Sequence, residues 1–254
     1  MQKSRKNKKA QVALFVTIAV VIIAAVSLIL ILRPGIRPVV KELAPDAYIK
    51  AAAKDAARGA IDILSVQGGI LEPTHYKLYN NNKVRYLCYT NLYYTKCVNQ
   101  QPLLKQFVEK EITSYVLPIV EEKIEKLKTD LINKGYEVRT EGSLDLITRI
   151  EPGKVVIDID YPITITKGEV KTRYEKFQAV LPSPLYRQIM LTEEIINQEI
   201  RWGNFDHVGY MIFRWEDDII RDRVDETTIY TLKDKNTEKE FIFAIRNYVM
   251  PAGI

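Results

Sequence analysis

The residue types that usually perform catalysis are few in this chain and do not occur in a recognised spacing. The 254 residues include two histidines, His75 and His207, and neither belongs to a zinc motif or a nucleophile–base motif. The chain has no glycine-rich phosphate loop and no calcium loop. We therefore predict no catalytic residue, no metal ligand and no cofactor. A hydrolytic site assembled from scattered residues remains the alternative.

One pair of carboxylates has a spacing that could bind a cation or share a proton. Asp158 and Asp160 lie two residues apart in the stretch VVIDIDYPI, which places both side chains on one face of a strand. The alternate positions are apolar, namely Val155, Ile157, Ile159 and Tyr161. The simpler interpretation is therefore a strand with one buried face and one wet face.

The densest charge cluster outside the N-terminus runs from Arg214 to Arg223. It contains Arg214, Glu216, Asp217, Asp218, Arg221, Asp222 and Arg223. Because its charges alternate in sign, we predict a surface network of ion pairs and not a metal site, which would need uncompensated carboxylates.

Aromatic residues offer a different chemistry, that of binding. Six tyrosines fall between residues 76 and 94, at positions 76, 79, 86, 89, 93 and 94. Tyrosine is a favoured strand residue, but it also stacks on sugars and on partner proteins. The candidates for partner binding are Tyr86, Tyr89, Tyr93 and Tyr94.

The only two cysteines, Cys88 and Cys97, lie within this tyrosine-rich segment. Strand-forming residues flank a predicted four-residue loop, Asn91–Tyr94, which would pair Thr90 with Thr95 and set the cysteines opposite each other. Directly opposed strand residues are close enough for a disulfide. We predict a structural disulfide, with a reduced pair in a strand core as the alternative.

A membrane segment is the firmest prediction from the N-terminal sequence. The run Val12–Leu32 contains 21 residues without a charge, a proline or a glycine. A helix of that length covers roughly 30 Å, the thickness of the hydrocarbon core of a bilayer. The run is longer than the apolar stretch of a cleaved secretory signal and leads directly into Arg33-Pro34-Gly35. We expect it to be retained in the membrane.

Charge predicts the orientation of this helix. Five basic residues and no acidic residue occupy the first ten positions, so this tail is expected to remain in the cytoplasm. The tail also accounts for the net charge of +5, because the other 32 basic residues equal the 32 acidic residues in number. The folded part is therefore close to neutral, which argues against a nucleic-acid partner. We expect a single-pass protein of the cell membrane whose C-terminal domain is extracellular.

The segment Lys8-Lys9-Ala10-Gln11-Val12, followed by the apolar run, resembles the class III signal of archaeal type IV pilin-like proteins. The resemblance covers about 25 residues and implies cleavage by a prepilin peptidase between Ala10 and Gln11. It also implies that the apolar helix packs into a filament core. In this chain Pro34-Gly35 is expected to end the helix, which makes it more like a tether.

The remaining sequence predicts an α+β fold: one N-terminal transmembrane helix followed by an ectodomain of antiparallel sheet or sheets packed with helices. The predicted parts are a tail (1–10), a membrane helix (11–33), a linker (34–45) and an extracytoplasmic domain (46–254). Helices are expected from Asp46 to Gly68-Gly69, over Pro102–Asn133 with a kink or break at Pro118, and from Pro182 to Trp202. The strands are expected within Ile70–Val98, as a meander of Tyr136–Ile150, Val155–Thr166 and Val170–Leu181, and as a hairpin of Thr227–Leu232 and Glu240–Val249.

Three functional hypotheses follow from these features. The first is a non-enzymatic, membrane-anchored surface protein of an archaeon, for example a pilin-like subunit or minor component, whose ectodomain binds protein partners or self-assembles. The second is an anchored extracytoplasmic hydrolase. The third is the external subunit of a larger membrane complex.

Overall fold

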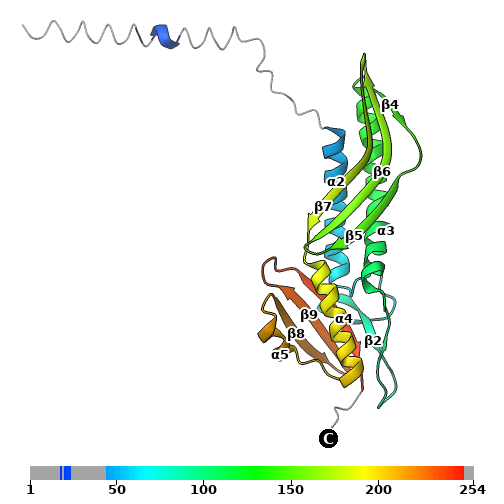
Figure 1. The fold of residues 1–254 in the computed structure, drawn as a ribbon, viewed down its shortest axis with the longest axis vertical. Coiled ribbons are helices and arrows are strands. Elements are labelled where there is room, and N and C mark those ends of the chain that lie inside the picture. Colours follow the sequence, from blue (N-terminus) through cyan, green and yellow to red (C-terminus); the bar gives the residue numbers. More distant parts are fainter. Residues whose placement is uncertain (1–17, 19, 24–43, 249–254) are drawn as a thin grey trace, which may run out of the picture. The chain divides into compact units, whose positions relative to one another are not determined.

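The computed structural model describes residues 18, 20–23 and 44–248 (Figure 1). The chain divides into two compact units, residues 1–44 and 45–254. Residues 18 and 20–23 are helical and exposed, but the rest of the predicted membrane segment Val12–Leu32 lies outside the described residues, as do Ala10 and Gln11. Within the described residues, no helix is both long enough and apolar enough to cross a membrane.

The first helix of the larger unit, α2, extends over Pro45–Ser65 and confirms the helix predicted from Asp46. It begins one residue earlier than expected, so Asp46 lies in the first turn, where it pairs with Lys50 at 2.9 Å. At the other end, Gly69 has a φ of +83° and its N–H donates to the carbonyl of Leu64 at 2.8 Å. Glycine adopts this left-handed conformation without strain, which is why the helix ends here.

Helix α3, Leu104–Asn133, packs against α2 along its length. Of the two outcomes predicted at Pro118, a kink or a break, the break was wrong, because α3 is one continuous helix. Pro118 removes the hydrogen bond to the carbonyl of Ser114, but both residues are exposed, so water can satisfy that carbonyl. The buried stripe continues past the proline through Ile112, Val116 and Val120.

A four-stranded antiparallel sheet confirms the predicted meander and packs against α2 and α3 (Figure 1). Its central strand pairs with all the others, and Gly142, at φ +86°, lies where the first predicted strand divides into two. The strands are β4 (Glu137–Thr140), β5 (Asp145–Glu151), β6 (Lys154–Lys167) and β7 (Val170–Pro182).

A six-stranded sheet occupies the other end of the unit, and helix α4 (Leu185–Trp202) covers one face of it (Figure 1). The predicted α4 and the hairpin of the last two strands are confirmed. The strands are β1 (Tyr76–Tyr79), β2 (Asn82–Tyr89), β3 (Val98–Asn99), β8 (Asp217–Val224), β9 (Thr227–Asp234) and β10 (Glu240–Arg246).

The expectation of purely antiparallel sheets was wrong for this second sheet. Strands β2 and β10 pair in parallel at its centre, so the sheet is mixed. A parallel pair needs a long crossover, and here the crossover contains most of the fold, including α3, the four-stranded sheet and α4. Strand β8 and helix α5 (His207–Phe213) were not predicted.

The six-stranded sheet is curved so strongly that its two edges meet. The hydroxyl of Tyr79 on β1 donates to Asp222 on β8, and Lys77 pairs with Asp225 at 2.5 Å. A small second core lies on the face away from α4 and contains Val84, Tyr86, Ile229, Ile242 and Ala244. The sheet therefore buries apolar residues on both faces.

Candidate binding surface

The disulfide-closed segment between β2 and β3 forms the most distinctive surface of the molecule. Cys88 and Cys97 form the predicted disulfide, with their Cα atoms 5.4 Å apart and both residues buried. Residues 90–97, called the 90–97 loop below, connect the two strands. Because β2 and β10 run in parallel away from the four-stranded sheet, this loop lies at the far end of the unit (Figure 1).

The predicted strand register around the disulfide was wrong. Cys88 pairs with Asn99 and Tyr89 with Val98, so Cys97 lies two residues from the position opposite Cys88. Strand β3 has only two residues, and the loop is correspondingly longer than the predicted Asn91–Tyr94 turn. A cross-link between neighbouring strands does not require direct opposition, since Cα atoms up to about 6.8 Å apart can be bridged.

Hydrogen bonds fix both ends of the 90–97 loop to the end of β10. The N–H of Thr90 donates to the carbonyl of Arg246 at 3.0 Å, and the N–H of Cys97 donates to Oδ1 of Asn247 at 3.0 Å. Asn247 in turn donates through Nδ2 to the carbonyl of Glu199 on α4 at 2.6 Å. The loop is therefore held by the disulfide and by a segment about 150 residues later in the chain.

A network of hydrogen bonds among charged residues and tyrosines contacts the 90–97 loop through Tyr93. Arg246 donates to Glu226 at 2.5 Å, to the hydroxyl of Tyr248 at 2.9 Å and to the hydroxyl of Tyr89 at 3.0 Å. Glu226 also accepts from Tyr248 and, at 3.1 Å, from Tyr93 of the loop. Hydrogen bonds from Tyr248 and Tyr93, together with the Arg246 charge, lower the pKa of Glu226 below its ordinary value.

The four candidate tyrosines divide into two groups. Tyr86 is buried and its hydroxyl shares a 2.8 Å hydrogen bond with Thr227, while half-buried Tyr89 holds Arg246. The ring of His75 packs against both of them, at centroid distances of 4.8 and 4.3 Å. Tyr86 and Tyr89 therefore pack beneath the 90–97 loop as structural residues, and their rings are not free for contact with a partner.

Tyr93 and Tyr94 of the loop form the second, accessible group. They are 65% and 79% exposed, and Leu92 beside them is 61% exposed. Tyr94 has a φ of +58°, a left-handed conformation that costs a non-glycine residue roughly 1 kcal/mol or more. The loop therefore holds large apolar side chains in solvent on a strained but braced backbone, as binding loops commonly do.

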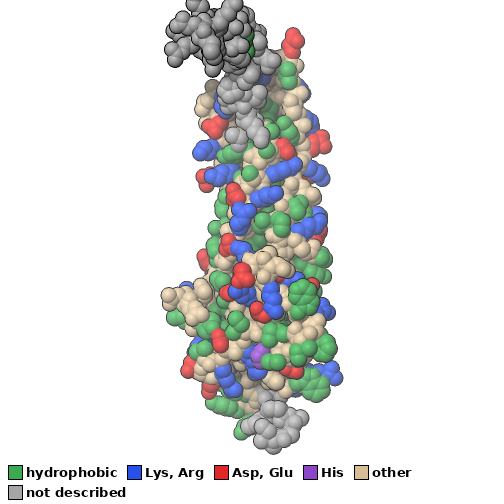
Figure 2. All heavy atoms as spheres, turned by 90° about the vertical axis from the view of Figure 1, so that its left-hand side faces the viewer, with side chains coloured by type: hydrophobic (Ala, Val, Ile, Leu, Met, Phe, Trp, Pro, Cys, Tyr) green, Lys and Arg blue, Asp and Glu red, His purple; other side chains and the backbone are tan. Residues whose placement is uncertain are grey.

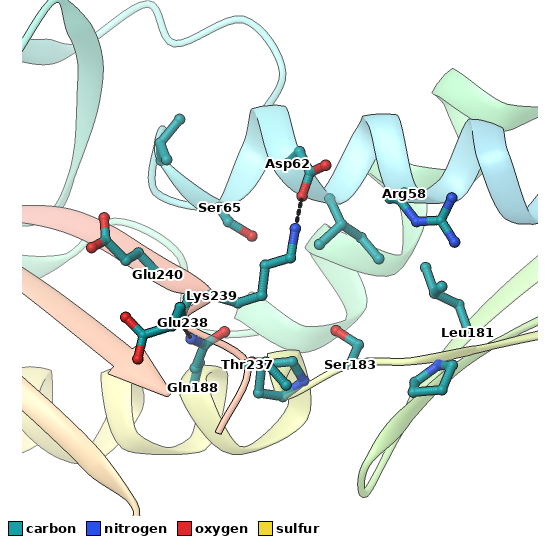
Figure 3. Close-up of a pocket in the computed structure, with 14 residues that line it drawn as sticks. Arg58, Asp62, Ser65, Leu181, Ser183, Gln188, Thr237, Glu238, Lys239 and Glu240 are labelled. Carbon is teal, nitrogen blue, oxygen red and sulfur yellow. Dashed lines mark hydrogen bonds and ion pairs between the residues drawn. The ribbon is translucent and has the colours of Figure 1, made fainter. Parts of the chain in front are cut away.

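A cleft of about 290 Å³ lies at the junction of the two sheets (Figure 3). The C-terminal half of α2, the β7–α4 junction and the β9–β10 loop line it. Lys239 crosses it to reach Asp62 at 2.6 Å, and the buried Gln188 donates to the carbonyls of Leu232 and Lys239 at 3.2 and 2.9 Å. These contacts join α2 and α4 to the six-stranded sheet.

The chemistry of this cleft is that of a structural junction. Its two serines, Ser65 and Ser183, have no histidine beside them among the lining residues, and Ser183 Oγ already accepts the N–H of Leu185 at 3.3 Å. His75 and His207 lie elsewhere, the first among the tyrosines and the second at the start of α5. Across the described residues, no group of three or more potential metal ligands comes together.

The other residues considered from the sequence are located on the two sheets. Asp158 and Asp160 lie on the wet face of β6, where they pair with Arg149 at 2.8 Å and Lys176 at 3.2 Å. The opposite face, with Val155, Ile157 and Ile159, is buried, as the alternation predicted.

The charge cluster near Arg214 is only partly a surface network. Asp217 is buried, and with Asp234 it holds Arg187 of α4. Sequence reasoning missed this site because Arg187 and Asp234 lie 30 and 17 residues away from Asp217 in the chain. No local spacing signals the contact.

No protein-family model, no curated protein and no solved structure matches this chain.

Proposed function

We propose that this chain is a single-pass, membrane-anchored extracytoplasmic protein with a binding or surface-assembly role, and that the 90–97 loop is its partner-binding surface. The apolar run Val12–Leu32 and the basic tail support the anchor and its orientation. The observation that carries the binding role is the exposure of Leu92, Tyr93 and Tyr94 on a disulfide-braced loop.

The position of the loop within the larger unit fits this role. The anchor would join the unit at Pro45, where α2 begins, and α2 runs roughly 30 Å from there towards the six-stranded sheet (Figure 1). The loop lies beyond that sheet, at the end away from Pro45.

The partner surface is tested by site-specific photo-cross-linking in intact cells. The full-length chain carries a photoreactive phenylalanine analogue at position 94 or, as the matched control, at the exposed position Val170 on the other sheet. We expect discrete adducts from position 94 and none from position 170. Equal labelling at both positions, or none at either, would refute the proposed surface.

The anchor and the pilin-like version have their own test. Protease added outside intact cells should digest the domain 46–254 and spare the N-terminal tail. Mass spectrometry of the membrane-extracted chain should find an N-terminus at Gln11 if a prepilin peptidase cleaves after Ala10. An intact tail would refute cleavage by a prepilin peptidase, but it would be consistent with an anchored binding protein.

The hydrolase hypothesis has no specific observation in its favour. The cleft in Figure 3 lacks a histidine among its lining residues, and Lys239, which crosses it, is paired with Asp62 at 2.6 Å. A catalytic acid or nucleophile normally needs an adjacent base and a perturbed pKa.

A further inference from the structure

A pocket separate from the cleft in Figure 3 lies between α4, the short helix α5 and the start of β8, and it is called the α4–α5 pocket below. Its volume is about 390 Å³, within the range of about 300–1,000 Å³ in which proteins bind small molecules. The lining side chains come from four residues within 187–194 of α4, from Tyr210 and Arg214 at α5, and from Glu216 and Asp217 beside the start of β8.

The surface around α5 carries charges of both signs. Helix α5 lies on the left-hand side of Figure 1, and Figure 2 views the unit from that side. Lysine and arginine side chains are interspersed with aspartate and glutamate side chains over this face. Two arginines and three carboxylates line the pocket itself. The charge of the pocket therefore favours neither a strongly anionic nor a strongly cationic ligand.

Part of the charge in the α4–α5 pocket is already used by the fold. Arg187 pairs with the buried Asp217 at 2.9 Å and with Glu216 at 3.3 Å. These ion pairs join α4 to the start of β8 and occupy all three side chains. A ligand in the pocket would therefore have to be recognised by the other polar groups.

Three polar groups of the pocket have no partner of this kind. Arg214 forms no ion pair and no side-chain hydrogen bond among the described residues, and the hydroxyl of Tyr210 forms no hydrogen bond among them. Glu194 pairs with no cation in the described part of the chain, and its carboxylate accepts only from Nε2 of Gln198, at 2.6 Å. A positive group, a hydroxyl and a negative group are therefore available to a ligand.

These three groups lie near one another. Burial is the main reason why the pKa of Tyr210 is raised, while the charge of Arg214 lowers this pKa and the charge of Glu194 raises it further. Both charges therefore act on the same hydroxyl. Met190 and Leu191 of α4 add apolar surface to the same pocket.

We infer that the α4–α5 pocket binds a free aliphatic α-amino acid. The carboxylate of the ligand accepts from the Arg214 guanidinium and the Tyr210 hydroxyl, and its ammonium donates to Glu194. Its aliphatic side chain contacts Met190 and Leu191. Since both free charges act on one hydroxyl, the ligand must carry its opposite charges close together, as an α-amino acid does on one carbon atom. A ligand with a single charge would leave either Arg214 or Glu194 without a partner.

Methyl NMR of the full-length chain in detergent micelles tests this inference. The chain has four methionines, and Met190 lines the pocket, so its isotope-labelled methyl group reports binding directly. The variant Met190→Leu identifies its signal. The probe, L-leucine, should shift this signal saturably with a Kd of about 1 mM, because Arg214 and Glu194 are exposed and water screens both ion pairs. A signal that does not move at about 50 mM leucine would overturn the inference, since weaker binding carries almost no free energy.

Two fragments of the probe test whether both charges of the ligand are needed. Isoamylamine is leucine without its carboxylate, and isocaproate is leucine without its ammonium. We expect each fragment to bind at least about tenfold more weakly than leucine, because each loses one charged hydrogen-bonding group. If either fragment bound as tightly as leucine, the pocket would be a site for amines or for carboxylates, and the inference of an amino-acid site would be wrong.

Two variants assign each charge of the ligand to its partner. Arg214→Gln should weaken leucine binding about tenfold and leave isoamylamine binding unchanged, because the amine has no carboxylate for Arg214 to hold. Glu194→Gln should weaken the binding of leucine and isoamylamine and leave isocaproate binding unchanged. The matched control is Arg223→Gln, which changes an exposed arginine of β8 outside the pocket and should alter none of the three affinities.

Other outcomes would overturn the assignment. Equal losses of leucine and isoamylamine binding in Arg214→Gln, or a loss in the control as large as in the pocket variants, would show that Arg214 does not hold the carboxylate. None of these residues belongs to the 90–97 loop, so adducts at position 94 would survive such a failure.

Discussion

The Arg187 cluster provides the sharpest stability test of this structure. Asp217 and Asp234 are register partners on β8 and β9, and both are 3% exposed. Arg187 of α4 pairs with Asp217 at 2.9 Å, with Asp234, and with Glu216 at 3.3 Å. It is the only cation near both buried carboxylates among the described ion pairs. The change Arg187→Met would leave two neighbouring carboxylates buried without a counter-charge.

The size of the effect follows from burial. Removing one partner of a buried ion pair costs about 3–5 kcal/mol. The Arg187 side chain is 34% exposed, so water would compensate part of this loss. We therefore expect the free energy of unfolding at neutral pH to fall by about 2–3 kcal/mol, measured by urea unfolding followed by circular dichroism.

The pH dependence distinguishes this cause from lost packing. Burial raises the pKa of Asp217 even in the intact cluster. Burial would also raise the pKa of Asp234, but hydrogen bonds from Thr237 and the Arg187 charge lower it below its ordinary value. In Arg187→Met both folded-state pKa values should lie above the unfolded values. Stability gained from such carboxyl groups is present at low pH and is lost as pH rises through the folded pKa.

The destabilisation of Arg187→Met should therefore shrink as the pH is lowered from 7 towards 4. Arg149→Met is the matched control, because Arg149 forms exposed pairs with Glu151 and Asp158 and should cost less than about 1 kcal/mol. A loss at Arg187 no larger than that of the control, or one that does not change with pH, would refute the reasoning.

Three further predictions concern the 90–97 loop. The double change Cys88→Ala and Cys97→Ala should lower the free energy of unfolding by about 2.5 kcal/mol, because the disulfide joins residues 9 apart in the chain and restricts the unfolded state. A loss below about 1 kcal/mol in urea unfolding would contradict this. Tyr94→Gly should stabilise the fold by about 0.5–1 kcal/mol, because glycine adopts the left-handed backbone of this position without strain. A loss of stability in calorimetry would argue against strain at this position. Because the pKa of Glu226 is lowered in the folded state, the stability that this carboxylate contributes is present above the unfolded pKa and is lost as the pH falls through the folded pKa. The NMR signal of the Glu226 carboxyl carbon should therefore titrate below pH 4.5. Tyr248→Phe, which removes a hydrogen bond to this carboxylate, should move the midpoint upwards.

Much of the local structure was predictable because it depends on neighbouring residues. The extents of α2, α3 and α4 follow from helical apolar spacing and from the glycines or prolines beside them. The meander and the last hairpin follow from alternation and turn residues, and the disulfide follows from two cysteines in adjacent strand segments. Strand β8 was missed because its charged sequence, DDIIRDRV, does not alternate as a half-buried strand does.

The candidate surface was predictable only as a region. The sequence marks the segment from Tyr76 to Tyr94 as rich in tyrosine, but tyrosine is equally common in cores and on surfaces. The structure buries Tyr86 on β2 and exposes Tyr94 on the loop, since burial depends on which distant segments pack against each residue. The bracing of the loop by Asn247 involves a sequence separation of 150 residues.

The sequence by itself determined the near-neutral charge of the folded part, the helices α2, α3 and α4, most of the strands, and the pairing of the two cysteines. The tertiary structure alone decided that β2 and β10 lie side by side in parallel, that the curved sheet brings Tyr79 to Asp222, and that Arg187 meets two buried carboxylates. The physical reason is the range of each interaction. Periodicity, turns and caps act over a few residues, whereas burial and ion pairing depend on chain segments that come together only when the whole domain has folded.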